Sequence, residues 1–109
     1  MTENRLVAKQ IADDVRATGV DARIRFMIGG WLLYADDVLI GQIHGTTLFM
    51  KESAYSRANF PMLRRSPPYP GARDAVEIPE FLRDDVDKFT RLVERTRMEF
   101  VKSPRQKRR

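Results

Sequence analysis

The side chains that most often carry out catalysis are scarce in this sequence. The chain has no cysteine and a single histidine, His44, so a thiolate nucleophile is excluded and no second imidazole exists to share a zinc ion with it. A histidine base also needs a nucleophile or substrate within hydrogen-bond reach, and no serine lies in a nucleophile-elbow motif. We expect His44 to be a turn or surface residue without a chemical role, and the protein not to be an enzyme.

Two further patterns have the residue types that bind ions. Three acidic pairs occur, but none has the spaced oxygen ligands of a calcium loop, and their settings indicate a helix surface, a turn and a helix N-cap: Asp13-Asp14, Asp36-Asp37 and Asp84-Asp85. Gly29-Gly30 lacks the lysine and the helix start of a phosphate-binding loop, and it favours a bulge or a close backbone approach. The sequence therefore predicts neither a metal nor a cofactor.

The net charge of +5 is concentrated at the C-terminal end. Five cations with no acid among them account for all of it, and the rest of the chain carries equal numbers of acidic and basic residues: Lys102, Arg105, Lys107, Arg108 and Arg109. Such a segment can neutralise nucleic-acid phosphates, or it can be a solvated tail that only improves solubility. Both alternatives stay open, and we divide the chain into a folded domain (residues 1–101) and a basic tail predicted to be disordered (residues 102–109).

Aromatic residues are frequent between residues 26 and 55, where they invite comparison with sheet surfaces that stack nucleic-acid bases: Phe26, Trp31, Tyr34, Phe49 and Tyr55. Aromatic side chains are enriched in strands for packing alone, so we expect most of them to lie in the core. Trp31 and Tyr34 are three residues apart and must face opposite sides of a regular strand.

The pattern of apolar residues and turn signals predicts the elements that hold these side chains. Apolar residues at helical spacing indicate a first helix over residues 3–18, ended by Gly19. Four β-rich segments follow, separated by Gly29-Gly30, Asp36-Asp37 and Gly45-Thr46: residues 24–28, 31–35, 38–44 and 47–51.

The second half of the chain is predicted to be more irregular. We expect a short helix over residues 52–60 with Ser53 as its cap, a proline-rich loop over residues 67–71, and one more short strand over residues 76–78. A helical segment over residues 80–82 and a last helix capped by Asp84 or Asp85 complete the chain. The predicted fold is a two-layer α+β domain with a mostly antiparallel meander of four to five strands and the last helix packed on the sheet.

Seven positions within residues 27–51 form a motif: Met27, Gly29, Gly30, Tyr34, Gly45, Leu48 and Lys51. This stretch resembles the N-terminal domain of the TfoX/Sxy competence-regulator family. Glu77-Ile78-Pro79-Glu80 followed by Asp84-Asp85 resembles the family's Val-Pro-Glu segment and its capped helix. The resemblance covers residues 6–97, and the chain departs from the family's pattern at Ile28, Leu32 and Asp37.

This resemblance implies a stand-alone regulatory module in transcriptional or competence-type control. Two-domain family members act with the cyclic-AMP receptor protein at competence promoters, so a protein partner is expected, with nucleic acid as a further partner through the tail. The family offers no catalytic or cofactor residues that match positions in this chain. The alternative is a module for a small ligand or a protein that has no role with nucleic acid.

Location and assembly are predicted from what the chain lacks. The stretch of residues 38–50 is short and contains Gln42 and His44, so it does not suit a bilayer span, and residues 1–9 do not resemble a signal peptide. We expect a cytoplasmic protein with no membrane contact, either monomeric or weakly dimeric.

Overall fold

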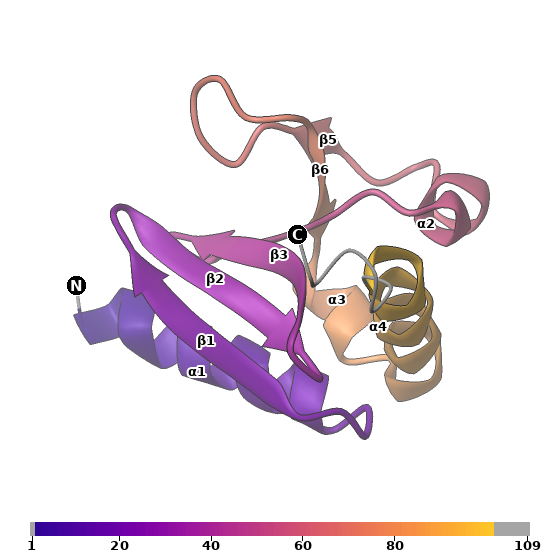
Figure 1. Cartoon of the computed structure of the whole chain (residues 1–109), viewed down its shortest axis with the longest axis horizontal. Helices are drawn as coiled ribbons and strands as arrows, with labels where there is room; N and C mark the ends of the chain where they lie inside the picture. The colour runs from indigo at the N-terminus through magenta and orange to yellow at the C-terminus, as the bar shows by residue number, and fades with distance from the viewer. Residues whose placement is uncertain (1, 102–109) are drawn as a thin grey trace, which may run out of the picture.

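A six-stranded antiparallel sheet with helices against one face forms the body of the protein (Figure 1). The computed structural model describes residues 2–101. The elements follow one another as α1 (Thr2–Arg16), β1 (Ala22–Met27), β2 (Gly30–Ala35), β3 (Val38–His44), β4 (Thr47–Met50), α2 (Ala54–Asn59), β5 (Arg65–Ser66), β6 (Ala75–Ile78), α3 (Glu80–Arg83) and α4 (Val86–Phe100). The predicted α+β class is confirmed, as are the antiparallel meander and the C-terminal helix packed on it.

Three tight hairpins connect the first four strands. The pairs Met27 with Gly30, Ala35 with Val38 and His44 with Thr47 each enclose a turn of two residues. Positive φ angles at Gly29 and Gly45 suit such turns, because glycine has no Cβ to clash. The predicted strands are therefore confirmed to within two residues. Gly30 was expected in the first turn but is the buried first residue of β2.

The last two strands extend the sheet from β4. The strand order is β1-β2-β3-β4-β6-β5, so the chain leaves the sheet after β4 and returns as β6 at the neighbouring position. The two residues of β5 pair with Ala75 and Val76 at the edge. The expected four to five strands were one too few, because a two-residue strand before a proline shows no periodicity that a sequence could reveal.

The sheet has a buried inner face and an uncovered outer face. Leu48 and Met50 of β4 and Val76 of β6 are buried on the inner face, whereas Phe49 between them points the other way. Against the inner face lie the apolar side of α1, including Ile11 and Val15, and that of α4: Phe89, Leu92, Val93 and Thr96. This side of the sheet is the core, and it makes the two-layer arrangement possible.

The helix boundaries follow local signals. Gly19 has a φ of 102° just after α1, as expected for a helix C-terminus. The hydroxyl of Ser53 accepts a hydrogen bond from the backbone of Ser56 in a capping box, and Asp85 caps α4 by accepting from Lys88. The longest described helices, α1 and α4, have fifteen residues each, so none of the described helices meets the length and apolarity that a bilayer span requires.

The aromatic residues are less buried than predicted. Trp31 pairs with Ile43 on the inner face and is half-buried, while Tyr34 pairs with Leu39 on the outer face, so the two do face opposite sides. Phe49 also lies on the outer face, and Phe26 is 63% exposed near the first hairpin. The expectation that most of these residues are in the core was wrong, because strand alternation places Tyr34 and Phe49 on the outer face and Phe26 lies on the edge strand.

The turn of the second hairpin contains two aspartates in a conformation that usually requires glycine. Asp36 and Asp37 have φ angles of 49° and 67°. Asp36 is held in place, since its backbone N–H donates to the Asp21 carbonyl and its carboxylate accepts from the Asp21 N–H, both at 2.9 Å. Asp37 is exposed and has no hydrogen bond or ion pair with another described residue.

We therefore expect Asp37→Gly to stabilise the protein by about 0.5 to 1 kcal/mol. Relief of a left-handed cost of about 1–2 kcal/mol should exceed the extra entropy that glycine gives the unfolded chain. Urea denaturation followed by circular dichroism measures the change. Asp36→Gly is the matched control, because it relieves the same kind of strain but loses the carboxylate, which accepts from the Asp21 N–H and pairs with Arg97. Equal stabilisation by both substitutions would show that the Asp21 contact is unimportant.

Candidate functional site

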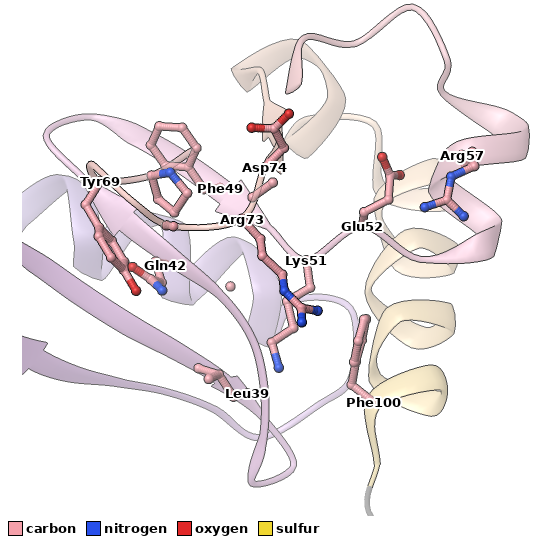
Figure 2. A pocket seen from close by; sticks show the side chains of 14 residues that line it. Leu39, Gln42, Phe49, Lys51, Glu52, Arg57, Tyr69, Arg73, Asp74 and Phe100 are labelled. Carbon is pink, nitrogen blue, oxygen red and sulfur yellow. The ribbon is translucent and has the colours of Figure 1, made fainter. Parts of the chain in front are cut away.

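A cavity of about 510 Å³ opens on the outer face of the sheet (Figure 2). Its floor is formed by side chains of β3 and β4, namely Leu39, Gln42 and Phe49. The loop between β5 and β6 makes one wall, and the segment that leaves β4 makes the other, together with Arg57 of α2 and Phe100 of α4. Residues far apart in the sequence therefore meet here, and the volume is in the range of about 300–1,000 Å³ that is usual for ligand sites.

The floor continues across the sheet as two rows of side chains. One row runs from Arg25 through Leu32 and Gln42 to Phe49, each residue directly opposite the next on the neighbouring strand. The other row runs from Arg23 through Tyr34 to Leu39. The strands thus present aromatic, amide and cationic groups toward solvent in one continuous surface, which we call the outer-face rows.

An aromatic cluster of His44, Phe49 and Tyr69 lies under the β5–β6 loop, and Phe49 and Tyr69 of this cluster line the cavity. The ring centroid of His44 lies 5.9 Å from that of Phe49 and 6.1 Å from that of Tyr69. Nδ1 of His44 donates to the Gly29 carbonyl at 3.1 Å, and Nε2 lies 2.7 Å from Oε1 of Gln42. Both ring nitrogens have partners inside the protein, so the imidazole orients this cluster and the first hairpin.

Cations line the opposite side of the cavity. Nζ of Lys51 lies 4.7 Å from the centre of the Phe100 ring, a cation–π contact that holds both side chains. Arg73 comes from the β5–β6 loop, and in Figure 2 its guanidinium is seen between Tyr69 and Phe100. Three cations, Lys51, Arg57 and Arg73, line the cavity against the acids Glu52 and Asp74. The balance favours an anionic ligand.

Glu52 is not available to a ligand, because Arg65 binds it with two nitrogens. Nε and Nη2 of Arg65 donate to the two carboxylate oxygens at 2.8 and 3.1 Å. The same guanidinium donates to the backbone carbonyls of Ser56, Phe60 and Leu63 at 2.6 to 3.2 Å. Hydrogen bonds from Arg65 hold the pKa of Glu52 below its usual range. This Arg65–Glu52 clamp fixes α2 and the start of β5, and thereby the rim of the cavity.

The family motif positions have mainly structural roles, and one of them reaches the cavity. Met27, Gly29, Gly30 and Gly45 build the hairpins, and a Cβ on Gly30 would lie 2.4 Å from the Ile43 carbonyl oxygen, which explains the close backbone approach predicted there. Leu48 is buried, Tyr34 lies in an outer-face row, and Lys51 lines the cavity. A helix does not follow Gly29-Gly30, so the turn offers no helix N-terminus to a phosphate.

Other predicted sites lie elsewhere. The proposed nucleic-acid contacts Lys102, Arg105, Lys107, Arg108 and Arg109 fall outside the described residues. Within residues 2–101, the three acidic pairs do not join further His, Asp or Glu side chains into a group that could hold a metal ion. The sequence did not predict Tyr69, Arg73 and Phe100 as site residues. Their local signals are weak: Tyr69 is a tyrosine between prolines, Arg73 is an isolated arginine, and Phe100 is the last apolar residue of a helix.

The chain matches no protein-family model and no curated protein sequence when it is compared with both. The resemblance to the TfoX/Sxy family therefore stays a prediction that depends on residues 27–51 and the segment 77–85.

We expect Glu52→Gln to destabilise the protein by about 1 to 3 kcal/mol at neutral pH, since it leaves the Arg65 guanidinium without its counter-charge. The pKa of Glu52 in the folded protein is below 4.5, its usual value in an unfolded chain. Between these two pKa values the unfolded chain binds more protons than the folded protein, so the free energy of unfolding rises with pH. The deficit of the variant should be largest above pH 4.5 and shrink as the pH falls through the depressed folded pKa. Urea denaturation at several pH values measures it.

Glu94→Gln, a substitution of an exposed glutamate on α4 with the same charge change, is the control and should leave stability at each pH near the wild-type value. Burial raises the pKa of Asp14, so this residue contributes to the pH dependence of stability with the opposite sign. The contribution is the same in the wild type and both variants, and it cancels when their stabilities are compared. A deficit of Glu52→Gln that does not vary with pH would contradict the charged clamp.

Proposed function

We propose that this protein is a non-catalytic regulatory module of the TfoX N-terminal type, which acts in transcriptional or competence-type control by binding a partner on the outer face of its sheet. The observation that carries the proposal is the cavity under the β5–β6 loop, where aromatic and cationic side chains from four separate segments converge. The regulatory part of the proposal is supported by the sequence resemblance in residues 27–51.

The composition of the cavity favours binding over catalysis. The histidine of the cluster uses both nitrogens in contacts with Gly29 and Gln42, and the carboxylate of Glu52 is bound by Arg65. The remaining groups, which include Arg73, Tyr69 and Gln42, can hold an anion, stack on a planar group or donate an amide hydrogen bond. These are recognition contacts, and a protein partner or a nucleic acid can use them.

A second candidate function is the binding of a small anionic ligand, and the enclosed part of the site favours it. The volume of about 510 Å³ suffices for a small molecule, and the cavity has walls on two sides of its floor. In that case the module would sense a metabolite and would have no direct role with nucleic acid.

The regulatory proposal is tested by deleting the gene in the source organism and sequencing the transcripts. We expect a defined set of transcripts to change, and re-expression of the wild-type protein to restore them. Arg73→Ala, which removes an exposed side chain at the cavity, should restore far less of the response.

Arg91→Ala is the matched control, since it removes the same charge from an exposed position on α4. This variant should restore the transcripts as the wild type does. An unchanged transcript profile after the deletion would refute the regulatory role, and equal rescue by both variants would refute the assignment of the site.

A further inference from the structure

The outer face combines a charge pattern and an aromatic pattern that point to one class of partner. Arg25 at the edge strand and Arg73 on the β5–β6 loop are exposed, and neither side chain forms an ion pair or hydrogen bond with any other residue in the described range 2–101. Elsewhere the arginines of the sheet layer are engaged, as Arg65 is by Glu52 and Arg23 by Asp21. The first outer-face row and the cavity thus form one surface, with Arg25 at the β1 end and Arg73 at the cavity end.

Planar groups lie between these cations. Tyr34 and Phe49 occupy the outer-face rows, and Tyr69, which is 45% exposed, leans over the sheet from the loop. Three strand spacings of about 4.8 Å separate Arg25 from Phe49, so only an extended ligand can contact both the strand edge and the cavity. A compact small molecule would fill the cavity and leave Arg25 unused.

We propose that the outer face binds single-stranded nucleic acid, which crosses the rows from the β1 edge and places one base in the cavity. This inference depends on the proposed binding role of the same face. Arg25 and Arg73 contact backbone phosphates, while Tyr69 and Phe49 stack on bases, the combination that single-strand-binding surfaces use. A duplex is disfavoured, because its bases are already stacked on one another and cannot reach a ring under the loop.

The sequence after α4 offers further cations for phosphate contacts. Phe100 lines the cavity, so the chain leaves α4 beside it, and five cations follow within residues 102–109. In the proposed complex these cations would contact further phosphates, and each such contact adds to affinity in a salt-dependent way. The tail would then strengthen binding, while the folded face would provide the preference for a single strand.

The test is fluorescence anisotropy with labelled oligonucleotides of about 12 nucleotides, within the usual site sizes of about 4 to 16. One mixed sequence is used as single-stranded DNA, as single-stranded RNA and as duplex DNA, from about 50 to 200 mM salt. We expect the full chain to bind at least one of the single strands about tenfold or more tightly than the duplex. This ratio corresponds to a difference in binding free energy of about 1.4 kcal/mol, which is a modest share of the energy of stacking on two bases.

Three variants separate the contributions. Tyr69→Ala should weaken single-strand binding by about 5- to 150-fold, the loss expected for one stacked base. Arg73→Ala should reduce the salt slope by about 0.7, the value for one phosphate contact on a single strand, whereas Arg91→Ala should change neither affinity nor slope. A chain truncated after residue 101 should bind more weakly yet keep its preference for the single strand.

Several results would overturn the inference. Equal affinity for duplex and single strand, with all binding lost in the truncated chain, would reduce the interaction to tail electrostatics. A mononucleotide that binds as tightly as the oligonucleotide would assign the cavity to a small ligand. If no oligonucleotide binds but Arg73→Ala still fails to restore the transcripts, the inference falls while the proposed regulatory site stands, with a protein as its partner.

Discussion

The two long helices pack on the same face of the sheet, and the remaining structure follows from that arrangement. Burial of Leu48, Met50 and Val76 against α1 and α4 supplies the apolar core that a chain of this size needs. Strand alternation then forces Phe49 and its row neighbours to the opposite side, where no helix covers them. The outer face is thus a consequence of the core, and within residues 2–101 its cavity is lined by the β5–β6 loop, the segment after β4, Arg57 of α2 and Phe100 of α4.

The Arg65–Glu52 clamp turns this open face into a site with walls. A guanidinium that satisfies a carboxylate and three backbone carbonyls at once fixes the end of α2 to β5. The loop that carries Tyr69 and Arg73 begins directly after β5, so its position depends on a charged interaction at one end and on the β6 ladder at the other. Arg73, which we propose as a binding cation, therefore depends for its position on Arg65, which does not line the cavity.

Most of the fold could be predicted from the sequence, but the site could not. Alternating β-rich segments, Ser53, Gly19 and Pro79 are local signals, and they placed the helices and five strands almost correctly. The cavity arises from segments around residues 42, 51, 73 and 100, which come together only through long-range pairing of β4 with β6. Phe100 is the last apolar residue of α4, and its ring lies at the rim beside Lys51 instead of in the core. No local pattern distinguishes these two outcomes.

The return of β6 to β4 also has a kinetic consequence. The first four strands pair with one another in sequence order through two-residue turns, so little loop entropy is lost when they associate. In contrast, β6 must close a long loop that includes α2 and β5 before it gains its first contact with Leu48. The meander can therefore assemble first and expose the cavity floor, while the walls form late and open early. A ligand bound at the site would therefore stabilise the contacts that form last when the chain folds and break first when it unfolds.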